Sequence, residues 1–189
     1  MHKIWKQSAT LLGVSILAMA AYLGLLQING NFHEVLPGEL YRSAQPTPHQ
    51  LADYIERYGI KTVINLRGPS QRAWYKDEVA TAERLAAQHV DFQMSVRRQL
   101  TPEESQRLIA LMRDAPKPIL IHCLAGADRT GLASVIYLQQ IAHIDEDTAE
   151  WQLSPIYGHL NLPFLKAYAM DETWEGLEQL LGIESRDLG

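Results

Sequence analysis

The sequence predicts an α/β domain with a mainly parallel central sheet flanked by helices, preceded by one N-terminal transmembrane helix. Three observations support this fold class. Short apolar, β-branched runs such as Thr62–Leu66 alternate with segments of helical periodicity, which is typical of parallel sheets. Capping and proline signals open two of the helical segments. Finally, residues 8–28 hold no charged side chain, so we divide the chain into 1–28, a membrane anchor or signal peptide, and 29–189, a single globular domain.

Composition and charge limit the classes of function. The chain has 189 residues, with 17 Lys plus Arg against 22 Asp plus Glu and a net charge of −5. No excess of positive charge is present to follow a nucleic-acid backbone, so we expect no nucleic-acid partner. Cys123 is the single cysteine, which excludes an intrachain disulfide and a cysteine-rich zinc site.

The N-terminal apolar run is long enough to cross a bilayer. Ser8–Ile28 comprises 21 uncharged residues, a helix of about 31 Å. Lys3 and Lys6 precede it, and Glu34 and Glu39 follow it. The positive-inside rule then predicts a single-pass protein of the inner membrane with its domain on the periplasmic, extracytoplasmic side.

A cleaved signal peptide is the alternative for this segment. Ala18-Met19-Ala20 has the small-x-small pattern of a cleavage site. The apolar run continues past it through Tyr22–Leu26, farther than a signal peptide needs, and this favours an uncleaved anchor.

The first half of the domain predicts two helix–strand pairs. Thr47-Pro48-His49-Gln50 has an N-cap, a proline at the first helical position and a capping-box partner, and Gly59 ends this helix. Thr62–Leu66 is a buried strand. A helix over Asp77–Gln88 and an alternating strand over Val90–Val96 follow.

The second half predicts one more such pair and a helical tail. Thr101-Pro102 opens a helix that ends at Pro116, and Ile119–Ile121 is a buried strand that continues into His122-Cys123. Thr130–Ala142 is a strongly apolar helix. Asp147–Ile183 predicts two or three further helices, in which Trp151, Tyr157 and Trp174 belong to the core.

The stretch His122–Gly131, HCLAGADRTG, holds the candidate site. It connects a buried strand to a helix N-terminus, where free amides and the helix dipole lower a thiol pKa and bind anions. Gly126 permits a tight turn, and the Arg129 guanidinium suits two phosphate oxygens. We call Leu124–Arg129 the phosphate loop, whose expected phosphate-binding residues are Leu124, Ala125, Gly126, Ala127, Asp128 and Arg129.

A thiolate at the base of such a loop can attack phosphorus. The Cys123 sulfur would displace an alcohol and form a phosphocysteine that water then cleaves. Arg129 and the loop amides would stabilise the charge of the transition state. This chemistry needs no metal and no cofactor.

The stretch resembles the cysteine-dependent tyrosine and dual-specificity phosphatases, whose motif is H-C-x5-R-[ST]. His122, Cys123, Arg129 and Thr130 match it. Glu39–Pro46 and Val63–Arg67 are similar to bacterial and fungal members of the atypical dual-specificity group, so the resemblance covers roughly residues 32–145. It implies a thiolate nucleophile at Cys123, phosphate binding by Arg129, and a Thr130 hydroxyl that stabilises the leaving thiolate.

The general acid departs from the family pattern, in which an Asp lies some thirty residues upstream of the cysteine. Asp91 fits that spacing, but we expect it near the start of the strand Val90–Val96 and so at the wrong end of the sheet. The loop after that strand, 97–101, holds no carboxylate. Asp128 is the first candidate, as in myotubularin-type lipid phosphatases, and Glu103 or Glu104 and then Asp91 remain as alternatives.

Two arginines follow the same strand. Arg97 and Arg98 are candidates for recognition of a second anionic group, or else a solvated pair at a strand end. The remaining histidines show no shared spacing and are interpreted as surface or packing residues: His33, His49, His89, His143 and His159.

These features predict a membrane-anchored, metal-independent phosphomonoester hydrolase. Its partners would be a phosphorylated protein or a phosphorylated lipid or inositol as substrate, and the membrane through Ser8–Ile28. A non-catalytic phosphate-recognition module and a rhodanese-type sulfurtransferase are the alternatives. The natural substrate and the oligomeric state are not determined by the sequence.

Overall fold

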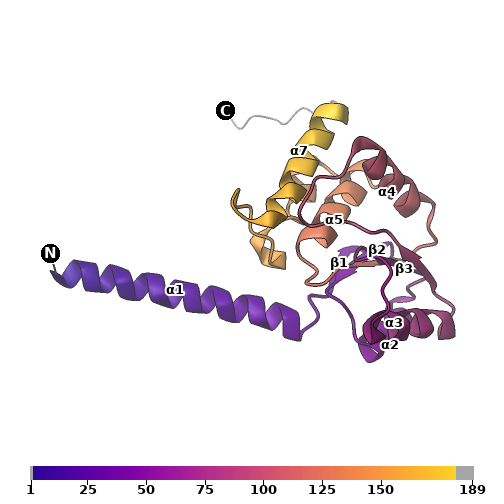
Figure 1. The fold of residues 1–189 in the computed structure, drawn as a ribbon, viewed down its shortest axis with the longest axis horizontal. Helices are drawn as coiled ribbons and strands as arrows, with labels where there is room; N and C mark the ends of the chain where they lie inside the picture. The colour runs from indigo at the N-terminus through magenta and orange to yellow at the C-terminus, as the bar shows by residue number, and fades with distance from the viewer. Residues whose placement is uncertain (1, 182–189) are drawn as a thin grey trace.

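The fold is described from a computed structural model. The structure describes the backbone of residues 2–181 and the side chains of residues 13–180. A long N-terminal helix extends away from a layered α/β domain, and the last described helix, α7, lies on the upper layer of that domain (Figure 1). The predicted tail helix to Ile183 extends beyond the described residues at its last two positions.

Five short strands form one sheet in the order β1-β2-β5-β3-β4. They are β1 (His33–Leu36), β2 (Leu40–Ser43), β3 (Thr62–Asn65), β4 (Gln88–Asp91) and β5 (Ile119–His122). β1 and β2 are antiparallel, and the other three pairings are parallel, so the predicted α/β class and mainly parallel sheet are confirmed. The last residues of the parallel strands are in register: Ser43 pairs with His122, His122 with Asn65, and Asn65 with Asp91.

Helices cover both faces of the sheet (Figure 1). α2 (Pro48–Tyr58) and α3 (Ala73–Arg84) lie on one face, and α4 (Pro102–Asp114), α5 (Asp128–Gln140) and α7 (Ala169–Leu181) lie on the other. α6 (Glu146–Glu150) and the 3₁₀ turns η1 (Pro155–Tyr157) and η2 (Lys166–Tyr168) connect α5 to α7. Alternate strand residues reach two separate cores, because successive side chains of a strand point to opposite faces; Ile119 and Ile121 join the α5 core, and Leu120 joins the α2 core.

The predicted helix starts are confirmed where local hydrogen bonds define them. Thr47 and Thr101 both form complete capping boxes, with Gln50 and Glu104 as the third helical residues. Gly59 ends α2 in the left-handed conformation, with φ 65°. These signals are local, so they survive any tertiary context that does not compete for the same amides.

Two strands were not predicted, and three sequence predictions are wrong in their bounds or burial. The strands β1 and β2 were not expected, and α3 covers Ala73–Arg84 instead of Asp77–Gln88. The chain turns at Ala86, whose φ is 57°, and the Gln88 amide then donates to the Lys61 carbonyl at 2.8 Å. Pairing with β3 therefore begins at Gln88, and β4 ends at Asp91 instead of Val96. Trp151, expected in the core, is 61% exposed.

The N-terminal segment folds as helix α1 (His2–Ile28). In the part of the chain that the structure describes, no helix is long and apolar enough to cross a membrane. This finding contradicts the expected transmembrane helix over Ser8–Ile28, and that part of the fold prediction is corrected. The flanking Lys3 and Lys6 used for its orientation lie outside the described side chains.

The last two turns of α1 contact the domain. The Tyr22 hydroxyl donates to the Ile156 carbonyl at 2.5 Å, and the Gln27 amide donates to the Ala125 carbonyl at 3.2 Å. Part of the apolar run is thus packed against protein, which the sequence pattern alone could not distinguish from packing against lipid.

Candidate active site

Cys123 lies at the carboxyl edge of the sheet. It follows β5, the central strand, and the phosphate loop connects it to α5. Its side chain belongs to the core, and the residue is 2% exposed. Parallel strands place their ligand sites at this edge, so the topology agrees with the predicted position of the nucleophile.

The carbonyl groups of residues 124–127 in the phosphate loop all accept hydrogen bonds from other parts of the protein. The Leu124 carbonyl accepts from the Gln45 amide, and the Ala125 carbonyl accepts from the side-chain amides of Gln27 and Asn31. The Gly126 and Ala127 carbonyls accept from the Arg42 guanidinium at 2.7 and 3.3 Å.

The backbone amides of the same loop, unlike its carbonyls, have no partner within the described protein. Among the described residues, none of the amides of residues 124–127 donates a hydrogen bond to protein. Free amides beside the first turn of α5 form an anion-binding site, because unpaired N–H groups and the helix dipole both favour negative charge. The site that the sequence predicted for phosphate therefore has the required donors in its backbone.

Gly126 is required at its position. Its φ is 70°, and a Cβ placed there would lie 2.5 Å from the Ala44 amide nitrogen and 2.7 Å from the Ser43 carbonyl oxygen. Both contacts are with backbone, which cannot move aside without shifting β2. The loop can therefore approach β2 this closely only with glycine.

We expect Gly126→Ala to weaken orthophosphate binding by at least about tenfold, a cost of about 1.4 kcal/mol. Gly38→Ala is the matched control, because Gly38 has a φ of 72° but a Cβ added there would have no atom within 4 Å. Both variants carry the left-handed strain, and only Gly126→Ala adds the clash. Isothermal titration calorimetry measures both; equal phosphate affinity in the two variants would contradict this account of the loop.

Arg42 stabilises the phosphate loop through hydrogen bonds to its carbonyls. It is fully buried, its Nη1 donates to the Gln152 carbonyl and side chain, and its guanidinium carbon lies 4.0 Å from the centre of the Tyr157 ring. Burial lowers the pKa of Arg42 to about 10, so the group stays charged at neutral pH. Arg42 therefore fixes the orientation of the Gly126 and Ala127 carbonyls.

Arg129 lies at the first turn of α5. Its Nη1 donates to the carbonyls of Leu66 and Met94, both at 3.3 Å. These long bonds hold the guanidinium beside the ends of β3 and β4, from which it can turn to an anion in the loop. Arg129 and Cys123 thus lie at the same edge of the sheet, and their catalytic roles stay predictions.

A second arginine lies nearby that the sequence did not single out. Arg67 follows β3, donates to the Gln45 side chain at 2.7 Å, and lies 3.7 Å from the centre of the Trp74 ring. Burial and then the positive charge of Arg129 lower the pKa of Arg67, which indicates that the two cations lie near each other. Two neighbouring cations favour a dianionic ligand.

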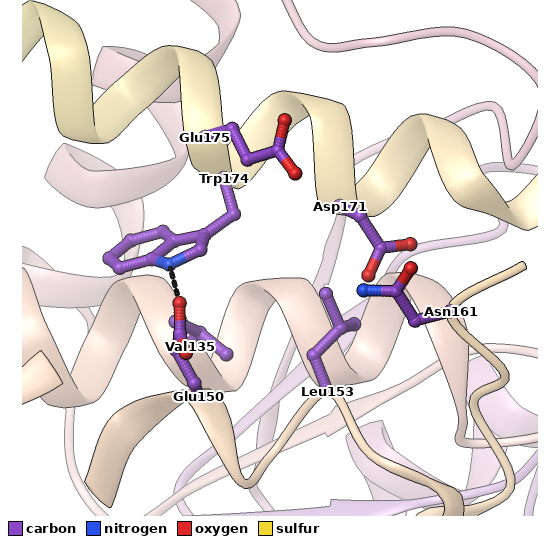
Figure 2. A pocket seen from close by; sticks show the side chains of 7 residues that line it. All are labelled: Val135, Glu150, Leu153, Asn161, Asp171, Trp174 and Glu175. Atoms are coloured by element: carbon purple, nitrogen blue, oxygen red, sulfur yellow. Dashed lines mark hydrogen bonds between the residues drawn. The ribbon is translucent and has the colours of Figure 1, made fainter. Parts of the chain in front are cut away.

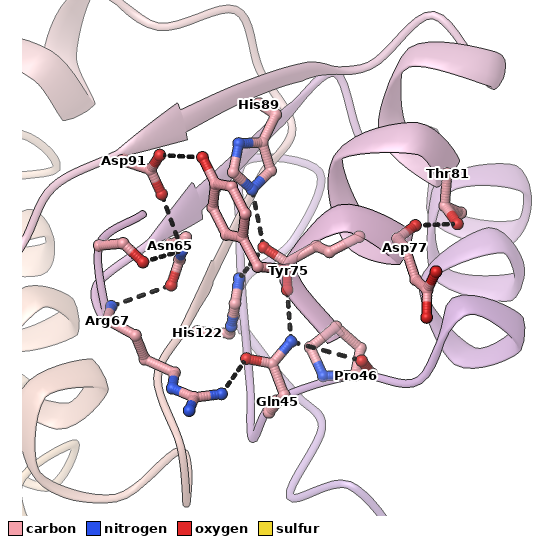
Figure 3. A network of polar contacts seen from close by, with 12 residues as sticks. Gln45, Pro46, Asn65, Arg67, Tyr75, Asp77, Thr81, His89, Asp91 and His122 are labelled. Atoms are coloured by element: carbon pink, nitrogen blue, oxygen red, sulfur yellow. Dashed lines mark hydrogen bonds and ion pairs between the residues drawn. The ribbon is translucent and has the colours of Figure 1, made fainter. Parts of the chain in front are cut away.

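A buried carboxylate supports His122, the residue before the nucleophile (Figure 3). Glu78 accepts from His89 at 2.7 Å and from His122 at 3.1 Å, and the Gln45 side chain donates to its other oxygen. Burial alone would raise the pKa of Glu78, but the hydrogen bonds from His122 and His89 lower it to about 2. Glu78 thus remains ionised and fixes the end of β5 on which Cys123 depends.

The other motif residues are placed close to the loop. Asp128 is the first residue of α5, with a side chain 28% exposed. The Thr130 hydroxyl is buried and has no hydrogen-bond partner among the described residues, which leaves it free to donate to a thiolate. The role of Thr130 remains a prediction of the family resemblance.

The sequence argument against Asp91 is wrong in its geometry. β4 ends at Asp91, so this carboxylate lies at the carboxyl edge and not at the start of a strand. Its oxygens accept from the Tyr75 hydroxyl at 2.5 Å and the Asn65 side chain at 2.7 Å (Figure 3). The hydrogen bond to Asp91 raises the pKa of Tyr75 to about 12. The Asp91 carboxylate is therefore engaged by two hydrogen bonds from within the protein.

The remaining candidates lie on α4 and the loop before it. Arg98 forms a bidentate ion pair with Glu104, which also completes the capping box of Thr101. Arg97 is exposed, and Glu103 lies in the exposed first turn of the same helix. None of these side chains has a described contact with the phosphate loop, and recognition of substrate by Arg97 or Arg98 stays a prediction.

Sequence reasoning missed Arg42, Glu78 and His159. An arginine in a short apolar stretch, Leu40–Ala44, and a glutamate on an apolar helix face were signals for burial with a specific partner. His159, interpreted as surface or packing, is fully buried and contacts Asp128. No sequence pattern connects it to the loop 31 residues earlier.

Comparison with known proteins identifies relatives of this chain. A sequence model described as the tyrosine phosphatase family matches residues 23–157. The dual specificity protein phosphatase TpbA of Pseudomonas aeruginosa is 31% identical over 123 residues, which cover 63% of this chain and 51% of TpbA. The chain thus spans about half the length of the curated relatives it matches.

Solved structures share the fold. A crystal structure of P. aeruginosa TpbA superposes with a TM-score of 0.59 and 24% identity, over 82% of this chain and 92% of the chain in that crystal structure. A second TpbA structure was determined in complex with pTyr, at 20% identity and a TM-score of 0.59, over 82% of this chain and 93% of that chain. The core of the PP-IP phosphatase SIW14 from S. cerevisiae gives a TM-score of 0.59 at 19% identity, over 80% of this chain and 93% of that chain.

Proposed function

Because this chain belongs to the tyrosine phosphatase family, we propose that it is a metal-independent phosphomonoester hydrolase with Cys123 as its nucleophile. One observation supports this most directly. Every carbonyl of residues 124–127 accepts a hydrogen bond from the protein, whereas the amides of the same residues, which directly follow Cys123, donate none in the described structure.

The proposed reaction has two steps. The Cys123 thiolate attacks phosphorus, the P–O bond to the alcohol breaks, and Asp128 gives the leaving oxygen a proton. Water then attacks the phosphocysteine, and the S–P bond breaks to return the thiolate. The loop amides and Arg129 stabilise the equatorial oxygens in both transition states, since they are fixed before the charge develops.

Phosphotyrosine is the substrate that we propose first. Its ring is long enough to bring a phosphate to a nucleophile that is 2% exposed, whereas the shorter phosphoserine needs a more open site. The pTyr complex of TpbA supports this choice. Phosphorylated inositols and lipids contain the same dianionic group and remain the second class, since Arg67 and Arg129 would accept either.

The test is hydrolysis of p-nitrophenyl phosphate in the presence of EDTA. We expect turnover that EDTA does not change and that vanadate inhibits, because vanadate adopts the geometry of pentacoordinate phosphorus. Sulfur transfer from thiosulfate without phosphate release would favour the rhodanese-type alternative, and tight phosphate binding without turnover would favour the recognition module. A release assay across phosphotyrosine peptides, inositol phosphates and lipid phosphates then ranks the substrates.

We also propose that the domain acts outside the cytoplasm. The support is the signal-peptide pattern of the N-terminus, with Lys3 and Lys6 before the apolar run and Ala18-Met19-Ala20 as a small-x-small cleavage site. A reporter that is active only outside the cytoplasm, fused after Gly189, is expected to be active, and a reporter that is active only inside the cytoplasm is expected to be silent. The reverse pattern would contradict this location, and the mass of the mature N-terminus would show whether Ala20 is a cleavage site.

A further inference from the structure

His159 lies between two carboxylates that come from different helices. It follows η1 and Gly158, and it is fully buried. Its Nδ1 lies 2.9 Å from Asp128 Oδ1, and its Nε2 lies 3.0 Å from Asp171 Oδ2. Asp128 is the first residue of α5, and Asp171 is in the first turn of α7.

Both ring nitrogens of His159 face acceptors. A neutral imidazole has one donor and one acceptor nitrogen, so only the imidazolium satisfies both contacts. Burial alone would lower the pKa of His159, but the hydrogen bonds to Asp128 and Asp171 raise it to about 9. At neutral pH the Nδ1 proton therefore points at the carboxylate that the proposed mechanism needs in its protonated form.

The charged groups around His159 are few. Asp128 faces it from α5 and Asp171 from α7, while Arg42 of β2 reaches the Ala127 carbonyl next to Asp128. The Tyr157 ring from η1 packs on the Arg42 guanidinium. One imidazolium between two carboxylates leaves one negative charge for Arg42 to balance.

Asp171, on the side of His159 opposite to Asp128, borders a cavity (Figure 2). Asp171 is 6% exposed and lines a space of about 140 Å³ together with Asn161, Glu150 and Glu175. Figure 2 shows the Asp171 carboxylate directed toward Asn161. Asp171 is therefore held in a polar environment, which suits a carboxylate that orients a cation.

We propose that Asp128, His159 and Asp171 form a proton relay in which His159 supplies the proton that Asp128 delivers to the leaving oxygen. The proposal rests on the proposed function. His159 touches no substrate in this scheme and acts through Asp128, so it is a positioning residue that also holds a proton. Asp171 orients the ring by accepting from Nε2.

The protons balance over the two steps. As the P–O bond breaks, the leaving oxygen takes a proton from Asp128, and the Nδ1 proton of His159 moves to Asp128. When water attacks the phosphocysteine, its proton goes to Asp128 and the relay returns one to Nδ1 of His159. The net change is one water consumed for each phosphoester bond, and no other reactant is needed.

The test uses His159→Gln, which keeps one amide donor but has no transferable proton. With an alkyl phosphate, whose leaving group requires protonation, we expect kcat to fall by about 10²-fold. With p-nitrophenyl phosphate, whose leaving group needs no proton, kcat should stay within about threefold of the wild type. A merely structural His159 would instead lower both rates by the same factor, and that result in a folded variant would overturn the relay.

The pH profile gives an independent readout on the wild-type protein. His159 is protonated below its raised pKa, so alkyl phosphate hydrolysis should persist to about pH 9 and fall above it. This alkaline limb should be absent with p-nitrophenyl phosphate and should move to lower pH in Asp171→Asn, which removes one of the two carboxylates that stabilise the cation. A wild-type limb below about pH 7, the range of an unperturbed histidine, would overturn the proposal.

These outcomes separate the two proposals. Circular dichroism and the melting temperature show whether His159→Gln is folded; if it is not, the wild-type and Asp171→Asn profiles decide. A wild-type protein that hydrolyses p-nitrophenyl phosphate but shows none of the predicted differences retains the proposed function and loses the relay. A wild-type protein inert toward both substrates refutes the proposed function and the relay together.

Discussion

Replacing Cys123 by serine should lower phosphomonoester hydrolysis by about 10⁴-fold or more, as expected when a nucleophile is removed. A serine hydroxyl is poorly ionised at neutral pH, and no base lies in described contact with this position to activate it. The change in volume is small, and the anion-binding amides of residues 124–127 belong to the backbone. Initial rates with p-nitrophenyl phosphate measure the effect.

Binding provides the control for this variant. Cys123→Ser should still bind orthophosphate or vanadate in calorimetry, since the Arg42 bonds to the Gly126 and Ala127 carbonyls do not involve the sulfur. Hydrolysis at a tenth of the wild-type rate or more would exclude Cys123 as the nucleophile. Loss of binding together with loss of the melting transition would instead identify a folding defect.

Asp128→Asn should lower the rate with an alkyl phosphate by about 10²- to 10⁴-fold, the usual contribution of a general acid. With p-nitrophenyl phosphate the loss should be much smaller, because nitrophenolate leaves without a proton. The asparagine keeps the size of the side chain and can still accept from His159. The ratio of the two losses, measured as kcat on each substrate, therefore reports proton transfer and not the position of Arg129.

Asp91→Asn is the matched comparison, since Asp91 also lies at the carboxyl edge of the sheet. Its carboxylate already accepts from the Tyr75 hydroxyl and the Asn65 side chain. We expect little change of rate on either substrate. A large loss at Asp91 that is confined to the alkyl phosphate would show that Asp91 is the acid, and equal losses at Asp128 on both substrates would give Asp128 a structural role.

Local signals in the sequence predicted what depends on neighbouring residues. The capping boxes at Thr47 and Thr101 use atoms three residues apart, so the sequence contains the whole interaction. The position of Cys123 between a buried strand and a helix is local in the same sense. The glycine at 126 was expected from its turn, although its close approach to Ser43 and Ala44 was not.

Long-range pairing determined what the sequence did not predict. The alternation over Val90–Val96 is a valid strand pattern, but β4 is fixed by pairing with β3, which begins at Gln88 and ends at Asp91. Arg42 and His159 act on the phosphate loop from 85 and 31 residues away. For such contacts the sequence can show that a polar residue is buried, but it does not show the partner. Asp91 was assigned to the wrong edge of the sheet because the pairing of β4 with β3 is also a long-range contact.

A trapped phosphocysteine is the most direct test of the central claim. The protein is mixed with a ³²P-labelled phosphotyrosine peptide, quenched in acid within the first turnover, and digested for mass spectrometry. We predict one phosphoryl group on the peptide that contains Cys123, and no such group in Cys123→Ser. Turnover by the wild-type protein with no label on Cys123 at any quench time, or with label on another residue, would contradict the assignment of Cys123 as the nucleophile.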